Sequence, residues 1–209
     1  MSKILCIYPA ENNTEFLRPV FNYLCTKNDV CGIDRSVTED DYFDVLKERL
    51  TEAELVLFMG HGSSNVLFGD NNNELFSNYN IDLLKNKKLI LFACRTSDFS
   101  KTYNLKNAVG FGFIPSSKED VHNGTLHHLD IEKLNFFDVK SLRASLCDIL
   151  LNTVKESNLL NLDEFVNCFA FNTNVEIVRY LTTKKETSKN YRILADILYY
   201  IRHEMILKR

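Results

Sequence analysis

Two short apolar runs, each followed by a chemically reactive side chain, constrain the fold of this chain most strongly. Residues 55–59 lead through Gly60 into His61, and residues 89–93 lead into Cys94. Short apolar runs bounded by turn residues are typical of parallel strands that are buried on both faces. In open α/β sheets, functional sites form just past the carboxyl ends of such strands. The sequence therefore predicts that His61 and Cys94 lie close together at one edge of a sheet.

The first part of the chain alternates between strand-like and helix-like patterns. Such alternation favours βαβ units and a mostly parallel sheet, so the fold class expected is α/β. The expected strands span about 3–8, 30–33, 54–59, 88–93 and 109–114, with a hairpin near 66–73, and the expected helices span about 14–27, 39–51 and 80–85.

After about residue 138 the apolar residues recur at helical spacing. Three helices are expected there, the second over about 163–181 and the third over about 189–207. We therefore divide the chain into an α/β core, 1–137, and a helical extension, 138–209, which packs on the core or continues it.

Composition narrows the classes of function. The 209 residues carry a net charge of -3, with 25 basic and 28 acidic side chains, which argues against a nucleic-acid-binding protein. No apolar run reaches the roughly 20 residues that span a membrane, and the N-terminus does not resemble a secretory signal. The expected location is therefore the cytoplasm, where the six scattered cysteines would be reduced thiols.

A cysteine beside a histidine suits nucleophilic catalysis. The thiolate is the reactive form, and an imidazole can take its proton and later deliver a proton to a leaving amine. Gly62 allows close backbone approach to a substrate, and its N–H with that of Cys94 could form an oxyanion hole.

These motifs resemble those of caspase-like cysteine proteases. Residues 57–62 (LFMGHG) are similar to the histidine motif of that family, and residues 89–96 (LILFACRT) are most similar to the cysteine motif of the bacterial CHAT proteases. The resemblance implies a three-layer α/β/α sandwich, with His61 as general acid/base, Cys94 as nucleophile and Gly62 in the oxyanion hole. It also implies peptide or protein substrates and no cofactor. The resemblance also implies a regulatory protein partner or an activating ligand. One role that it suggests for the protein itself is that of an effector in bacterial defence or regulated death.

One departure from the family concerns specificity. Metacaspases carry an acid two residues before the cysteine, where this chain has Phe92. A metacaspase-like pocket for a basic side chain is therefore not expected. Weaker candidates for substrate binding are four acids elsewhere near the expected sheet edge, although a solvated side chain is the favoured interpretation of each: Glu11, Asp98, Glu119 and Asp120.

Other readings stay open. His61 could be a turn histidine and Cys94 a buried small apolar residue. The chain could then be an inactive caspase-like module that binds a partner through its helical tail. A flavodoxin-like small-molecule binder has no supporting fingerprint. The cluster of His122, His127 and His128 lacks accompanying ligands, so no metal site is expected.

Overall fold

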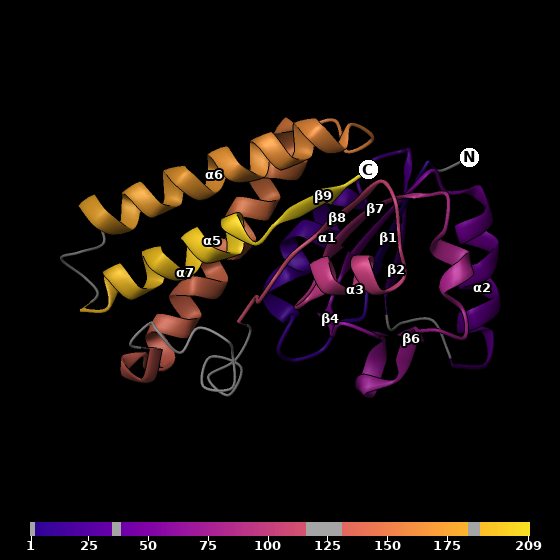
Figure 1. Cartoon of the computed structure of the whole chain (residues 1–209), viewed down its shortest axis with the longest axis horizontal. Coiled ribbons are helices and arrows are strands. Elements are labelled where there is room, and N and C mark those ends of the chain that lie inside the picture. Colours follow the sequence, from indigo (N-terminus) through magenta and orange to yellow (C-terminus); the bar gives the residue numbers. More distant parts are fainter. Residues whose placement is uncertain (1–2, 35–38, 116–130, 184–188) are drawn as a thin grey trace.

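The computed structural model describes residues 3–34, 39–115, 131–183 and 189–209. Its centre is a six-stranded sheet in the order β2-β1-β3-β7-β8-β9 (Figure 1). Neighbours from β2 to β8 pair in parallel, and β9 runs antiparallel to β8. The expectation of an α/β fold with a mostly parallel sheet is confirmed. The strands are β1 (Ile4–Tyr8), β2 (Val30–Asp34), β3 (Leu55–Met59), β7 (Lys88–Phe92), β8 (Ala108–Gly110) and β9 (Ile206–Lys208).

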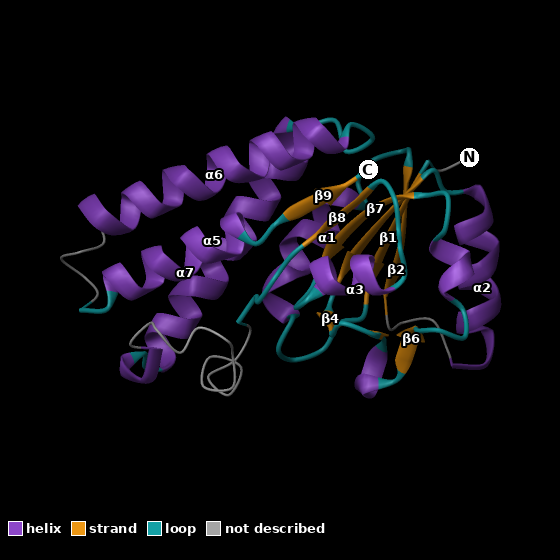
Figure 2. Ribbon diagram, in the orientation of Figure 1, coloured by secondary structure: helices purple, strands orange, loops and turns teal. Residues whose placement is uncertain are grey.

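Helices cover both faces of this sheet (Figure 2). The α-helices of the described ranges are α1 (Arg18–Leu24), α2 (Glu39–Glu52), α3 (Thr96–Thr102), α5 (Phe136–Glu156), α6 (Leu162–Thr182) and α7 (Tyr191–His203). Successive residues of β1 enter different cores: Cys6 packs with residues of α1, α5, α6 and α7, whereas Leu5 packs with residues of α2 and α3. Burial on both sides explains why the strands are continuously apolar rather than alternating.

A small antiparallel sheet follows β3 directly. It consists of β4 (His61–Gly62), β5 (Leu67–Phe68) and β6 (Glu74–Phe76), so the expected hairpin is present. His61 pairs with Phe68 across this sheet. The hairpin thus fixes the backbone that carries the histidine.

The expected helix at 14–27 is shorter and divided. A 3-10 turn, Glu15–Leu17, precedes α1, which begins at Arg18. Pro19 occupies the first turn of α1, where its missing N–H costs nothing. The Thr14 side chain does not cap a helix; its hydroxyl accepts a hydrogen bond from the Glu11 N–H at 3.2 Å instead.

Two expected elements end early. The strand at 109–114 stops at Gly110, because the next two carbonyls, of Phe111 and Gly112, accept hydrogen bonds from the Ser97 and Arg95 N–H groups. The last helix ends at His203 rather than near 207, and the chain then joins the sheet as β9. The helical tail therefore contributes the sixth strand of the main sheet.

The helices after residue 135 share one hydrophobic core with the sheet. Leu142, Phe169 and Leu198 are fully buried in the same cluster as Tyr8 and Phe92. In the described ranges, no helix combines the length and the apolar character needed to cross a bilayer.

Candidate active site

The register between β3 and β7 places His61 and Cys94 at equivalent positions past the ends of these two strands. Met59, the last residue of β3, pairs with Phe92, the last residue of β7, and His61 and Cys94 each lie two residues further along. Both side chains line one shallow pocket with an empty volume of about 260 Å³. Its other walls are mainly apolar and come from Thr14, Phe16, Leu17, Gly60, Phe92, Ala93 and Ile114.

His61 also lies beside a carboxylate. Its Nε2 atom lies 3.5 Å from Oε2 of Glu11, and the two side chains are 25% and 19% exposed. Glu11 belongs to the turn after β1, which the Thr14 hydroxyl supports. A carboxylate at this distance restrains the orientation of the imidazole ring. With Nε2 directed at Glu11, proton exchange on the other side of the ring would use Nδ1.

Gly62 packs tightly against the cysteine turn. A Cβ atom at position 62 would lie 2.9 Å from the Cys94 carbonyl oxygen and 3.1 Å from the Ala93 Cβ. Only glycine therefore allows this approach of the two backbones without displacement. The structure thus brings together the two residues that were expected to form an oxyanion hole.

Thr96 holds the turn that presents Cys94. Arg95 adopts the left-handed conformation, with φ of 57°, so the chain bends sharply between β7 and α3. The fully buried Thr96 hydroxyl donates to the Leu91 carbonyl at 2.6 Å and accepts from the Phe111 N–H at 2.8 Å. This hydroxyl ties β7, the turn and the segment after β8 together. The sequence analysis did not identify Thr96 as a structural residue, although its position two residues after Cys94 is a signal that could have been used.

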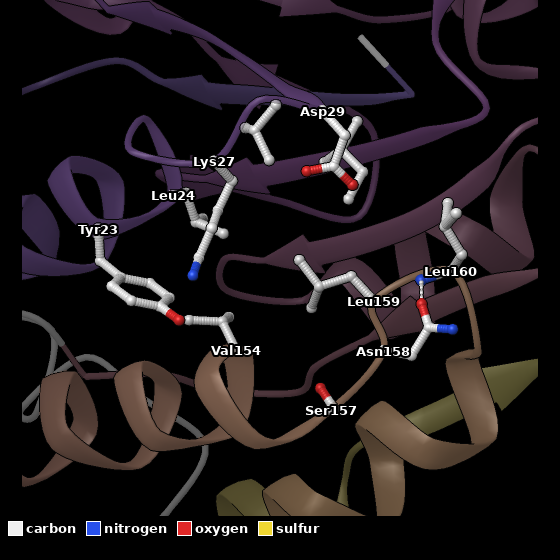
Figure 3. Close-up of a pocket in the computed structure, with 11 residues that line it drawn as sticks. Tyr23, Leu24, Lys27, Asp29, Val154, Ser157, Asn158, Leu159 and Leu160 are labelled. Carbon is white, nitrogen blue, oxygen red and sulfur yellow. Dashed lines mark hydrogen bonds between the residues drawn. The ribbon is translucent and has the colours of Figure 1, made fainter.

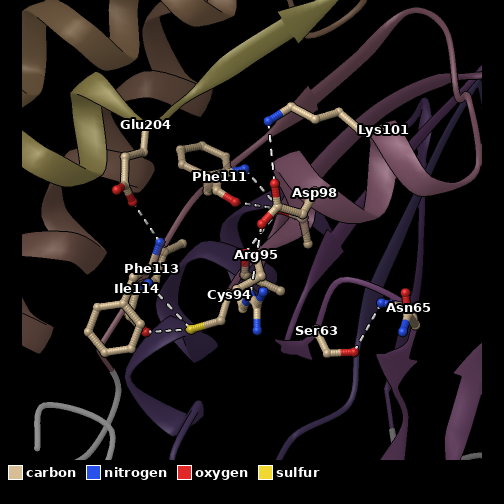
Figure 4. A network of polar contacts seen from close by, with 12 residues as sticks. Ser63, Asn65, Cys94, Arg95, Asp98, Lys101, Phe111, Phe113, Ile114 and Glu204 are labelled. Carbon is tan, nitrogen blue, oxygen red and sulfur yellow. Dashed lines mark hydrogen bonds and ion pairs between the residues drawn. The ribbon is translucent and has the colours of Figure 1, made fainter. Parts of the chain in front are cut away.

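The Cys94 thiol contacts the backbone of Ile114 (Figure 4). Its S–H donates to the Ile114 carbonyl at 2.9 Å, and the Ile114 N–H donates to the sulfur at 3.3 Å. The first of these contacts requires the neutral thiol, since a thiolate has no proton to donate and would be repelled by the carbonyl oxygen. A neutral Cys94 thiol therefore satisfies both contacts with Ile114.

Of the other predicted acids, Asp98 is not among the residues that line the pocket. Asp98 lies on α3, is 44% exposed and pairs with Arg95 and Lys101. Glu119 and Asp120 lie outside the described residues, as do the three histidines at 122, 127 and 128. Within the described ranges, no group of three or more potential ligands is placed to hold a metal ion.

Several other cysteines are in surroundings that suppress thiolate formation. Burial raises the pKa of Cys147 to about 11, and that of Cys6 also lies well above its ordinary value. Desolvation, followed by nearby carboxylates, raises the pKa of Cys25 and of Cys168. These four thiols are therefore poor nucleophiles near neutral pH.

A larger pocket, of about 490 Å³, lies elsewhere (Figure 3). Its walls include Ile4 and Val30, the first residues of β1 and β2, so it lies at the amino edge of the sheet. Ser157 is the one serine that lines this pocket, and its hydroxyl donates a hydrogen bond to the Thr153 carbonyl at 2.7 Å. The residues that line this pocket include no cysteine and no histidine, so it holds no thiol–imidazole pair, and the pocket of His61 and Cys94 remains the candidate site.

No family model, curated protein or solved structure matches this chain. The interpretation of the site depends on its own geometry. That geometry consists of a thiol and an imidazole in one pocket, a carboxylate 3.5 Å from the imidazole, and a glycine backbone against the thiol-bearing turn.

Proposed function

We propose that this chain is a cysteine endopeptidase with a caspase-like α/β/α sandwich fold. The observation that carries the proposal is the shared pocket of His61 and Cys94. These residues follow β3 and β7, which are the third and fourth strands of the main sheet in chain order. That order agrees with the motif order of the caspase-like family. The mostly parallel sheet with helices on both faces is compatible with the same fold.

In the proposed reaction, His61 accepts the proton of Cys94, and the thiolate attacks the carbonyl carbon of a peptide bond. The oxyanion that forms would be bound by the N–H groups of Gly62 and Cys94. Protonated His61 then donates its proton to the leaving amine, and the C–N bond breaks to give a thioester. Water, deprotonated by His61, attacks the thioester and releases the carboxylic acid and the thiol.

Glu11 has a supporting role in this scheme. The imidazolium formed beside the thiolate carries a positive charge, and the Glu11 carboxylate lies 3.5 Å from its Nε2 atom. We therefore assign Glu11 to orienting His61 rather than to binding substrate. The apolar walls at Phe16, Leu17 and Phe92 favour an uncharged substrate side chain at this pocket.

Cleavage of a peptide library combined with alkylation tests the proposal. We expect cleavage by the wild type, a loss of roughly 10³-fold or more in Cys94→Ala and in His61→Ala, and iodoacetamide labelling concentrated at Cys94. The labelling rate at Cys94 should fall in His61→Ala. Cys168→Ala is the matched control, because it removes a partly exposed thiol on α6, far along the chain from the pocket.

The contrary result would be uniform labelling of the accessible cysteines with no peptide cleaved. A cleavage activity that survives Cys94→Ala would also overturn the proposal, since it would belong to another group or to a contaminant.

One observation favours the alternative of a non-catalytic binding module. Helix α6 exposes four large apolar side chains, Phe171, Val175, Val178 and Leu181, which are 44% to 63% exposed. In that case the tail would bind a partner and Cys94 would be dispensable. Charged substitution at Val178 should then abolish a binding function that Cys94→Ala leaves unchanged.

A further inference from the structure

The C-terminal tail reaches the segment that contacts the Cys94 thiol. Glu204 follows the last residue of α7, and its Oε2 accepts a hydrogen bond from the Phe113 N–H at 3.0 Å (Figure 4). Phe113 directly precedes Ile114, whose carbonyl and N–H groups both contact the Cys94 thiol. Two residues that are 91 positions apart are thereby joined beside the candidate nucleophile.

The pairing of β8 with β9 places Glu204 there. Gly110 pairs with Ile206 in the antiparallel ladder, so the same register carried two residues further sets Gly112 against Glu204. A Cβ at position 112 would collide with the Glu204 carboxylate. Glycine at 112 therefore leaves the space that the carboxylate fills.

A second set of bonds holds the same segment from the cysteine turn. The Arg95 N–H donates to the Gly112 carbonyl at 2.6 Å, and the Ser97 N–H donates to the Phe111 carbonyl at 2.9 Å. Residues 111–114 are therefore fixed between the turn that bears Cys94 and the end of α7. A shift of this segment must alter the contact of Ile114 with the thiol.

We propose that Glu204 is a positioning residue, which holds the Phe113–Ile114 backbone on the Cys94 thiol and so restrains its reactivity. This inference rests on the proposed nucleophilic role of Cys94. The Ile114 carbonyl accepts the S–H proton at 2.9 Å and so favours the neutral thiol, whereas the N–H contact to the sulfur, which would favour the thiolate, is longer at 3.3 Å. Loss of the charge-assisted bond from Glu204 to Phe113 frees the segment to move away. The thiol can then pass its proton to His61, and the thiolate becomes available.

The test measures the rate of iodoacetamide alkylation at each cysteine by mass spectrometry. In Glu204→Ala we expect the rate at Cys94 to rise roughly tenfold, the factor expected for loss of one hydrogen bond to a charged group. Glu204→Gln keeps an acceptor oxygen of the same reach but loses the charge, so its rate should lie between those of the wild type and Glu204→Ala. Asp196→Ala is the matched control, because it removes an exposed carboxylate from the same helix.

An unchanged or lower rate at Cys94 in folded Glu204→Ala would overturn the inference. An equal rise at Cys168 and Cys94 would do the same, since it would indicate general loosening of the chain. If Glu204→Ala does not fold, Glu204→Asp, which withdraws the carboxylate by one methylene, should give a smaller rise at Cys94 alone. A rise at Cys94 without cleavage of any peptide would refute the peptidase proposal and leave the role of Glu204 standing.

Discussion

At the scale of single residues, the contact between Glu11 and His61 can be tested by removing the charge of Glu11. Glu11→Gln keeps the size and hydrogen-bonding capacity of the side chain but removes its negative charge. We expect alkylation of Cys94 at neutral pH to slow by roughly threefold to tenfold, because the imidazolium that accompanies the thiolate loses a stabilising charge. Glu15→Gln is the control, since it removes a more exposed carboxylate that pairs with Arg18. Equal rates in Glu11→Gln and wild type would contradict the assigned role.

A buried thiol away from the site makes stability depend on alkaline pH. Burial raises the pKa of Cys147 from its ordinary 9.0 to about 11. Between these two pH values the folded state keeps a proton that the unfolded state has released. The free energy of unfolding therefore falls as the pH rises through this window. Below the window both states are protonated, and titration of this thiol does not change the stability. We expect the stability difference between wild type and Cys147→Ala to narrow by roughly 2 kcal/mol from pH 8.5 to pH 10.5. Urea titrations at both pH values measure it, and parallel pH dependence in the two proteins would contradict it.

The sequence allowed His61 and Cys94 to be placed together because each follows a recognisable buried strand. Glu11 was one of several acids near the expected sheet edge, and nothing in the pattern distinguished it from Asp98. Its contact with His61 depends on the geometry of the turn after β1, which Thr14 supports through hydrogen bonds. Glu204 was not identified, because its place beside Gly112 follows from strand pairing between distant segments.

At the scale of elements, Thr96 connects β7, α3 and the segment after β8. Thr96→Val keeps the shape of the side chain but removes the hydroxyl that bonds to Leu91 and Phe111. We expect a loss of about 2–3 kcal/mol in the free energy of unfolding, because buried backbone groups lose their partner. Thr51→Val, at an exposed position of α2 where the hydroxyl bonds to the Lys47 carbonyl, should change stability by less than about 1 kcal/mol. Chemical denaturation compares the two, and similar losses in both variants would refute the role given to Thr96.

The predicted elements agree best where burial alone determines them. Strands β3 and β7 lie within a residue of their expected bounds because both faces are covered. β8 is shorter than expected because the apolar run from Phe111 to Ile114 is bound by the cysteine turn instead of a neighbouring strand. A run of apolar residues reports burial but not which backbone groups accept its hydrogen bonds, so the end of this strand could not be predicted.

At the scale of the whole molecule, the tail completes the sheet and also shares its core. The sequence shows the helical periodicity of the tail but not the return of residues 206–208 to the edge of β8. This return is a pairing between distant segments, and a three-residue strand is too short to show a recognisable hydrophobic pattern. Helix α7, which contributes side chains to the main core, thus directly precedes Glu204 and β9 in the chain.

We therefore expect the sheet and the tail to unfold as one unit. Leu198 of α7 is fully buried in the core that contains residues of β1 and β7. Leu198→Ala should therefore lower the free energy of unfolding of the whole molecule by about 2–4 kcal/mol. Tyr199→Ala, at a position that is 43% exposed, is the neighbouring control with a smaller effect. Hydrogen exchange followed by mass spectrometry should show equal losses of protection in β1 and in α7 of Leu198→Ala. Normal protection in β1 with lost protection in α7 would mean that the tail is a separate folding unit, and a change in the tail could then reach Cys94 only through the local contact of Glu204 with Phe113.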